Sequence, residues 1–569
     1  MTSRKVLVDA LLACGLADDE AAQLAALQPT PGNSWTVEVL NTGKVDETKL
    51  AGELARLFKS PLELIESSKV ERSVLGALPS RFVFKHHVLP IAVTDTQARL
   101  ATYDVFNQVA RRLAQQQLAP RKIEWVIVPR GQLIRTIKAL YGVGAETFEE
   151  ILASTRTYDG ERTEETQDIT SDDPEASVVK FVNQVIREAI VERATDIHVE
   201  PLDNDLRIRY RIDGILHEVA VPPQLRVLQS AIISRLKVMA HMDIAERRLP
   251  QDGRINLNTN SGFIDVRVST IPTVNGESIS LRLLSRSDSL QFGIERLDMS
   301  EKHVRTVKAL LTQPNGIILV TGPTGSGKST TLYSFLTSIN AVTRRIITIE
   351  EPVEYRLQGV SQIDVKSEIG LTFANGLRAI LRQDPNIVMV GEVRDFETAE
   401  ISIRAAMTGH LVFSTLHTND AVSGITRLLD MGIEPFLLAS VVRCFLAQRL
   451  VRTICPDCKT VTGYDLDYLR EIGAPFPADM KFYKGAGCDH CRQTGYRGRA
   501  AIYEICIVNE NLRRMVVRKE TGTAMKARAI QDGMDTLRTD GWRRVLSGHT
   551  TVEEVVRVTS QDEAIAETD

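Results

Sequence analysis

The chain has 569 residues, with 69 Lys and Arg residues against 73 Asp and Glu residues, and its formal net charge is −4. This length exceeds what one compact core accommodates and predicts about three or four domains. The near balance of charge argues against a protein that mainly coats nucleic acid, and the hydrophobic content of 43% is ordinary for a globular protein.

The start of the chain, MTSRKVLVDALLACGLADDE, does not read as a signal peptide, because acidic residues appear where an apolar stretch should continue. The best candidate for a membrane span, residues 435–451, is interrupted by Arg443, Gln448 and Arg449. It also falls short of about 20 apolar residues. We therefore expect a cytoplasmic protein that reaches a membrane only through partners.

Residues 1–150 are predicted to form a small α/β domain. Leu50, Leu54 and Leu57 line one face of an amphipathic helix within residues 46–61. The other expected elements are strands at 82–93, 98–105 and 123–129 and a helix at 131–142.

Residues 151–176 are polar and acidic, and they contain too few apolar residues to pack, so we expect a flexible linker. A second α/β domain is expected at 177–290. It should begin with a helix over 178–194, which alternating strands such as LRIRYRID (206–213) follow.

The next domain, at 291–452, contains the loop GPTGSGKS, which matches the phosphate-binding pattern GxxxxGK[ST]. An apolar strand at 316–320 precedes the loop and a helix follows it, as this motif requires. Lys328 is expected to contact the β and γ phosphates of ATP, and the Ser329 hydroxyl to bind Mg²⁺. The expected nucleotide contacts are Gly322, Pro323, Thr324, Gly325, Ser326, Gly327, Lys328, Ser329 and Thr330.

Two further apolar strands of this domain end in acids. Glu392 follows the strand of NIVMVGEVRD, where it is placed to hold Mg²⁺ through its hydration shell or to orient water. The strand of RIITIEEPVEY delivers Glu350, Glu351 and Glu354, and we expect Glu350 to polarise the attacking water. The alternative is that these are solvated acids at strand ends.

Two histidines, His410 and His417, flank the apolar stretch of AAMTGHLVFSTLHTND. Each alone is more often a structural histidine. Because they follow the phosphate loop and both acids along the chain, we expect them to sense the γ-phosphate, one directly and one by positioning a loop.

Two CxxC pairs, Cys455 with Cys458 and Cys488 with Cys491, are typical of a tetrahedral zinc site in a segment at 453–500. Four protein ligands leave no open position, so the predicted Zn²⁺ is structural. Disulfides are the alternative, and a reducing cytoplasm disfavours them. His490 is a possible alternative ligand. A helical extension is expected at 501–569.

The phosphate loop, ITIEEPVE, VMVGEVRD and TGHLVFSTLHTND, in this order, resemble the secretion-superfamily ATPases. These are the assembly motors of type II secretion and type IV pilus extension and, more distantly, pilus retraction motors. ATDIHVEP, RIDG, RRLPQDGRI and DVRVSTIPTVNGE of the second domain match as well. The likeness runs from about Ser177 to Ile505, and residues 1–150 match loosely. Glu351 departs from the family's box, which usually has Asp there.

The resemblance implies a RecA-like ATPase domain, a PAS-like domain before it and a ring of six subunits. It also implies that arginines of the second domain reach the nucleotide, for which Arg267 and Arg282 are the best candidates and Arg254 the next. A guanidinium forks onto phosphate oxygens, so this role suits arginine, although exposed strand arginines are the plainer alternative. Within the family, the four cysteines and the N-terminal domain mark assembly ATPases, because retraction motors lack both.

We therefore predict an α/β multidomain ATP hydrolase that uses ATP, Mg²⁺ and Zn²⁺. Its homohexamer would act at the cytoplasmic face of the inner membrane, on a platform protein and other components of a pilus or secretion machine, with residues 1–150 as a docking domain. A nucleic-acid translocase is the first alternative, which the balanced charge and the lack of a basic-aromatic groove oppose. A nucleotide-gated adaptor without useful turnover is the second, which the intact acids and histidines oppose. The sequence leaves pilus extension and type II secretion equally open.

Overall fold

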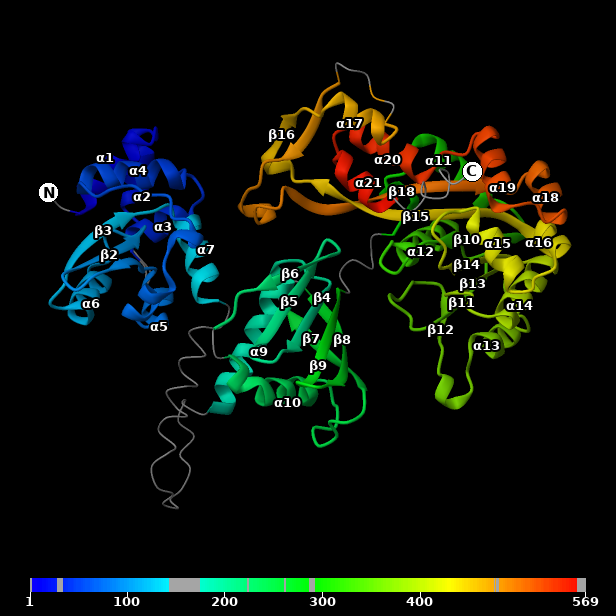
Figure 1. Cartoon of the computed structure of the whole chain (residues 1–569), viewed down its shortest axis with the longest axis horizontal. Coiled ribbons are helices and arrows are strands. Elements are labelled where there is room, and N and C mark those ends of the chain that lie inside the picture. The colour runs from blue at the N-terminus through cyan, green and yellow to red at the C-terminus, as the bar shows by residue number, and fades with distance from the viewer. Residues whose placement is uncertain are drawn as a thin grey trace. The chain divides into compact units, whose positions relative to one another are not determined.

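The structure is a computed structural model that describes residues 3–27, 34–142, 174–222, 225–259, 262–285, 292–474, 476 and 480–559 (Figure 1). The chain divides into two compact units, of which the first contains residues 1–257 and 264–284 and the second contains residues 258–263 and 285–569. Among the described residues, no helix has both the length and the apolar character that a membrane span requires. Most of the predicted linker, residues 151–173, lies outside the described residues.

The N-terminal domain combines a three-stranded sheet, in the order β1-β2-β3, with helices. Helix α4 forms as expected, with Leu50 and Leu54 buried and the Asp46 side chain accepting a hydrogen bond from the Lys49 backbone N–H at 2.8 Å. The strand expected at 82–93 is wrong in its first half, which is helical and buries Phe82 and Val83. The elements are α1 (Ser3–Ala13), α2 (Asp18–Ala25), α3 (Trp35–Asn41), α4 (Glu47–Phe58), α5 (Ser80–His86), β1 (Leu89–Val93), β2 (Gln97–Thr102), α6 (Gln108–Leu118), β3 (Lys122–Ile127) and α7 (Arg130–Tyr141).

The second domain packs two helices against a six-stranded sheet with the strand order β6-β5-β4-β9-β8-β7. The elements are α9 (Pro174–Val191), β4 (Asp196–Pro201), β5 (Leu206–Ile212), β6 (Ile215–Val219), α10 (Gln229–Met239), β7 (Gln251–Thr259), β8 (Gly262–Thr273) and β9 (Gly276–Ser285). Helix α9 thus begins within the last residues of the segment predicted as a linker.

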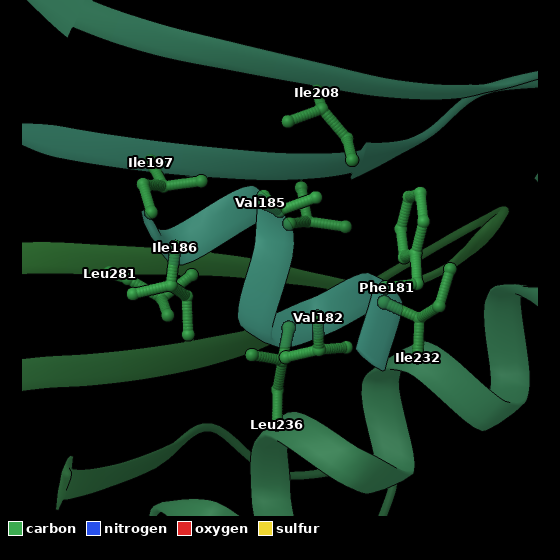
Figure 2. A pocket seen from close by; sticks show the side chains of 10 residues that line it. Phe181, Val182, Val185, Ile186, Ile197, Ile208, Ile232, Leu236 and Leu281 are labelled. Carbon is green, nitrogen blue, oxygen red and sulfur yellow. The ribbon is translucent and has the colours of Figure 1, made fainter. Parts of the chain in front are cut away.

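The core of this domain lies between the helices and the sheet. Figure 2 shows Phe181 and Val185 of α9 and Ile232 and Leu236 of α10 among the apolar side chains that meet there. These side chains enclose a cavity of only about 10 Å³, which is at the lower limit for a single water molecule. The cavity is therefore part of a packed core and offers no space for a ligand.

The nucleotide domain is built on a seven-stranded sheet with the strand order β12-β11-β13-β14-β10-β15-β18. The described pairs are parallel except β15 with β18, which is antiparallel. The elements are α11 (Glu301–Leu311), β10 (Gly316–Thr321), α12 (Lys328–Ile339), β11 (Ile346–Glu350), β12 (Ser361–Asp364), α13 (Phe373–Ile380), β13 (Ile387–Val390), α14 (Phe396–Met407), β14 (Leu411–Leu416), α15 (Ser423–Asp430), α16 (Pro435–Val441), β15 (Val442–Ile454) and β18 (Tyr496–Ile507).

Strand β10 is buried on both faces, which explains its uninterrupted apolar sequence. Ile317 and Leu319 belong to a core with α14, α15 and α16, whereas Ile318 and Val320 belong to a second core with α11 and α12. The apolar segment 435–451, considered above as a membrane span, is instead divided between helix α16 and strand β15. Its apolar residues are needed for the core of the sheet.

The C-terminal region continues this sheet and then becomes helical (Figure 1). Strand β18 pairs with β15 along most of its length, so the expected boundary at residue 500 falls inside a strand of the main sheet. The elements are β16 (Lys459–Thr462), α17 (Leu466–Glu471), β17 (Phe482–Gly485), α18 (Glu510–Val517), α19 (Gly522–Gln531), α20 (Leu537–Leu546) and α21 (Val552–Thr559). Short 3-10 helices lie at Ser67–Lys69, Arg72–Ala77, Leu225–Leu228, Ile294–Leu297, Ser367–Ile369, Pro456–Cys458 and Asp489–Cys491.

Candidate active site

The phosphate loop connects the carboxyl end of β10 to the amino end of α12, as the sequence predicts. Gly325 and Gly327 have φ angles of 79° and 90°, a conformation that favours glycine. A Cβ atom at Gly322 would lie 2.6 Å from the Gln448 carbonyl oxygen, so β15 approaches the loop too closely for a side chain. Ser329 and Thr330, at the amino end of α12, are exposed to solvent, where phosphate and Mg²⁺ have access to them.

Lys328 is folded back over the loop that precedes it. Its Nζ atom donates hydrogen bonds to the carbonyl oxygens of Gly322 at 2.8 Å and Pro323 at 3.1 Å. Burial lowers the pKa of Lys328 to about 8. The charge of Glu392 opposes this shift, and the charge of Arg449 adds to it. The lysine thus lies within electrostatic range of the acid predicted to assist it.

Glu392 lies two residues beyond β13, at the edge of the sheet where the phosphate loop begins. Its two carboxylate oxygens have different partners, since Oε1 accepts from Arg394 and Oε2 lies 3.1 Å from the Nε2 atom of His417. Burial by itself would raise the pKa of Glu392, but Arg394 and His417 outweigh it and hold the pKa below its ordinary value. Glu392 is therefore a well-oriented anion.

Glu350 is the last residue of β11 and is only 5% exposed. Its Oε1 atom accepts hydrogen bonds from the Thr348 hydroxyl at 2.6 Å and the Gln362 amide at 3.1 Å, and Oε2 accepts from the Tyr333 hydroxyl. Burial raises its pKa, although these hydrogen bonds oppose the shift. A raised pKa suits a general base, so the geometry keeps Glu350 as a candidate for that role.

The two acid-tipped strands lie side by side. Strand β11 pairs with β13 in parallel, and the Gly391 N–H donates to the Ile349 carbonyl oxygen at 2.7 Å. Arg394 adds a bridge between the strand ends, because its Nη1 atom lies 3.0 Å from Glu351 while Nη2 contacts Glu392. Glu351, the residue that departs from the family's box, is thus a partner of Arg394.

The histidines lie at opposite ends of β14. His417 follows the strand and contacts Glu392, as expected of a residue near the γ-phosphate. His410 precedes the strand, and its Nδ1 atom lies 2.8 Å from the Ala405 carbonyl oxygen. Since β14 is parallel to β10 with Leu416 opposite Thr321, His410 lies about 20 Å from the phosphate loop of its own chain. His410 is therefore too far away to touch a γ-phosphate bound by the loop of its own chain, and its expected part in sensing the phosphate stays a prediction.

The predicted arginines belong to the sheet of the second domain. Arg282 on β9 is exposed, and its Nε atom donates to Asp196 at 3.0 Å. Arg267 on β8 is half-buried, and Arg254 on β7 is exposed. Asp196 also pairs with Arg211, so two arginines contact one carboxylate on this face. Contact between these arginines and a nucleotide stays a prediction.

The four cysteines of the CxxC pairs converge. Their Sγ atoms all lie within 4.8 Å of one another, and the Cys455–Cys488 and Cys458–Cys491 pairs are 3.7 and 3.8 Å apart. A tetrahedral zinc with Zn–S bonds of about 2.3 Å requires sulfur–sulfur distances of about 3.8 Å, whereas a disulfide requires about 2.05 Å. The described residues therefore fit Zn²⁺ and do not fit disulfides. His490 lies within 4.8 Å of the Cys488 Sγ atom, but it is not needed to complete the four-sulfur set, and its Nδ1 atom contacts Asp457 at 3.0 Å.

Sequence reasoning missed three residues that shape this site. Arg394 and Tyr333 orient the two candidate carboxylates, and Gln448 supports the loop by accepting a hydrogen bond from the Thr331 hydroxyl at 2.7 Å. Arg394 could have been recognised as the only cation in the VMVGEVRD stretch. Gln448 carried no signal, because it lies on a separate strand far along the chain.

Comparisons with known proteins identify two families along the chain. Residues 171–557 match the family described as type II/IV secretion system protein, and residues 58–147 match the MshEN domain. The type IV pilus assembly ATPase PilB of Myxococcus xanthus is 41% identical over 543 residues, which cover 94% of this chain and 95% of that protein. The type II secretion system protein E of Pseudomonas aeruginosa is 48% identical over 398 residues, which cover 70% of this chain and 78% of that protein.

The structural comparison bears on the fold alone. The crystal structure of the ATPase DotB from Legionella pneumophila matches 70% of this chain and 98% of its own length, with a TM-score of 0.50 and 18% sequence identity. Together with the family matches, it confirms the expected α/β multidomain fold, in which a RecA-like nucleotide domain follows a PAS-like domain and an N-terminal domain.

Proposed function

Because this chain belongs to the family of type II/IV secretion system proteins and is an ATP hydrolase, we propose that it is the assembly motor of a pilus or secretion machine. In this proposal six copies form a ring at the cytoplasmic face of the inner membrane. Hydrolysis moves a membrane platform protein, which loads pilin-like subunits into a growing filament. The N-terminal domain docks onto that machine.

One observation carries the catalytic part of this proposal. At a single sheet edge, the Glu392 carboxylate is held between Arg394 and His417, within electrostatic range of Lys328 of the phosphate loop. A fixed anion in contact with an imidazole ring beside a triphosphate site suits phosphoryl transfer, which depends mainly on positioning and electrostatic stabilisation.

The residues take the following roles. The loop N–H groups and Lys328 would bind the phosphates, and the exposed Ser329 hydroxyl would hold Mg²⁺, whose bound water Glu392 would help to orient. Mg²⁺, when bound, neutralises charge on the β and γ phosphates. Glu350 orients the attacking water and accepts its proton, which its raised pKa favours. His417 responds to the γ-phosphate through its contact with Glu392.

The arginines of the second domain complete the proposal. Arg267, Arg282 and Arg254 lie on adjacent strands β8, β9 and β7 of one sheet. We assign them the contact with the phosphates that closure of the two domains would make, because a guanidinium that arrives on closure couples hydrolysis to movement.

The catalytic assignment is tested by Glu392→Gln in the purified full-length protein. We expect kcat to fall by about 100-fold or more, since an oriented charge is lost, while nucleotide still binds. Hydrolysis at the full rate would overturn the role of Glu392.

The biological assignment needs a deletion strain in which surface filaments are counted and secreted enzymes are assayed in the same cultures. Loss of filaments with intact secretion identifies pilus extension. Intact filaments with exoenzymes retained in the periplasm identify type II secretion. A strain with neither defect would contradict the proposal.

A further inference from the structure

The segment after β14, residues 417–421, is here called the His417 loop. Its first residue lies at the candidate active site, where His417 contacts Glu392 at 3.1 Å. Its next residues contact the end of β10, the strand before the phosphate loop, since the Asp420 carbonyl oxygen accepts from the hydroxyls of Thr418 at 3.0 Å and Thr321 at 3.4 Å. The loop is thus short and tied to the active site at its start.

The far end of the His417 loop is bound by residues of the C-terminal region. The Nζ atom of Lys526, on α19, lies 2.8 Å from the Oδ2 atom of Asp420, and both side chains are largely buried, with exposures of 23% and 13%. Although burial opposes it, the charge of Lys526 and hydrogen bonds from Ser423 hold the pKa of Asp420 below its ordinary value. A mostly desolvated, hydrogen-bonded pair restrains position more strongly than a surface ion pair.

Two strand residues hold the same loop. Arg449 of β15 donates to the Asn419 carbonyl oxygen at 2.6 Å. The Glu504 side chain of β18 is fully buried, and it accepts from the backbone N–H groups of Ala421 at 2.8 Å and Leu537 at 3.3 Å. Glu504 therefore joins the loop to the start of α20 directly, by one carboxylate.

We propose that Lys526 is a positioning residue for ATP hydrolysis, which holds the His417 loop through Asp420 so that His417 stays against Glu392. The inference rests on the proposed role of His417 and adds that the C-terminal helices set its position. A displacement of α19 would then change the hydrolysis rate without touching the nucleotide. Errors of about 1 Å at a catalytic group can cost up to about 100-fold in rate, so a loosened loop is expected to slow the reaction.

The test measures kcat and KM for ATP in the full-length protein with Lys526→Met, His417→Ala and both substitutions together. We expect Lys526→Met to lower kcat about 10-fold with little change in KM, because an interaction needed in the transition state is loosened. Lys526→Arg should restore most of the rate. The double variant should be no slower than His417→Ala alone, because both act through one group.

Arg528→Ala is the matched control, since Arg528 lies on the same helix and pairs with Asp532 at 2.8 Å, away from the His417 loop. It should leave kcat unchanged. If Lys526→Met does not fold, as judged by circular dichroism and gel filtration, Asp420→Asn weakens the same pair from the loop side. It should give the same loss of kcat and the same non-additivity with His417→Ala.

Two outcomes separate this inference from the proposal on which it rests. If His417→Ala slows hydrolysis while Lys526→Met and Asp420→Asn do not, Lys526 has no positioning role and the assignment of His417 stands. If His417→Ala hydrolyses ATP at the full rate, the assignment of His417 is wrong and the positioning role fails with it. Losses that multiply in the double variant would also overturn the inference.

Discussion

Tyr333 of α12 donates a hydrogen bond to Glu350 of β11, and its hydroxyl oxygen also accepts from the Glu354 backbone N–H at 3.2 Å. Helix α12 begins at the phosphate loop, and Glu350 is the candidate base. Any displacement of α12 would therefore reach the Glu350 carboxylate through the buried Tyr333 hydroxyl.

Tyr333→Phe tests this link by removing that hydroxyl while keeping the ring. Glu350 would retain Thr348 and Gln362 as partners but lose the one that joins it to α12. We expect kcat to fall about 10-fold with nucleotide affinity nearly unchanged, and stability to fall by about 1–3 kcal/mol because a buried carboxylate loses a partner. Single-turnover hydrolysis and fluorescent-nucleotide binding measure the two effects separately. An unaltered kcat would show that Glu350 needs no orientation by α12.

The histidines are expected to behave differently from each other. His410→Gln should change kcat by less than about twofold, because His410 lies roughly 20 Å from the phosphate loop of its chain along β14. Its main effect should be a lower melting temperature, since its Nδ1 atom contacts the Ala405 carbonyl oxygen at the end of α14. His417→Ala is the matched comparison and should lower kcat. Equal losses of kcat in both variants would contradict the placement of His410 as structural.

The zinc assignment predicts the metal content of purified protein. Mass spectrometry of the metal should find about one zinc per chain, because four sulfurs at tetrahedral distances form one closed site. Cys458→Ser should lose most of that zinc and lower the melting temperature, as should treatment of the wild type with a strong chelator. His490→Ala should retain the zinc, since His490 contacts Asp457. Loss of zinc in His490→Ala with retention in Cys458→Ser would overturn the ligand set.

Stability at acid pH should depend on Glu554. Its side chain is buried and accepts from Arg557 at 2.8 Å and from the Arg452 backbone N–H at 3.1 Å. Burial alone would raise its pKa, but Arg557 and Arg452 lower it from 4.5 to about 2. The folded state therefore binds fewer protons than the unfolded state between these values, so the stabilisation is complete above about pH 4.5 and is lost as the pH falls toward 2.

Glu554→Gln should accordingly lower the free energy of unfolding by about 2 kcal/mol at neutral pH. This figure is smaller than the full pKa shift implies, because Arg557 is partly exposed and its charge is screened by solvent. Its melting temperature should lie below that of the wild type at pH 7, and the gap should narrow as the pH falls from 5 to 3. Glu553→Gln, at an exposed position of the same helix, is the control for loss of a carboxylate from this helix without loss of the buried Glu554 pairs. A gap that stays constant with pH would contradict the lowered pKa of Glu554.

The sequence predicted best what lies within one element. The phosphate loop, with its strand and helix, was recognisable because its pattern is local. The placement of Glu350 and Glu392 near the loop was predictable because parallel strands end at one edge of a sheet. Residues 82–86 were misread as a strand because short apolar runs fit either structure. The sequence did not show which of His410 and His417 lies at the phosphate end of the strand between them, because only the sheet register shows which end of that strand faces the phosphate loop.

The contacts between distant segments could not be predicted. Lys526 and Asp420 are 106 residues apart, and each is an unremarkable charge in its own stretch. Gln448 belongs to no local sequence pattern, and it supports the phosphate loop only because β15 approaches Gly322 closely. Such pairs arise from tertiary packing, which determines which polar groups are buried together and must therefore satisfy one another.

Strand β15 runs without interruption from Val442 to Ile454, passes the phosphate loop at Gln448 and is followed at once by Cys455. The stretch from Gln448 to Cys455 is about 23 Å long in a strand. A tilt of about 10° at the loop end would carry the zinc ligand through about 4 Å. Strand β15 is therefore long enough to turn a small tilt at the phosphate loop into a displacement of several ångströms at the four-cysteine cluster.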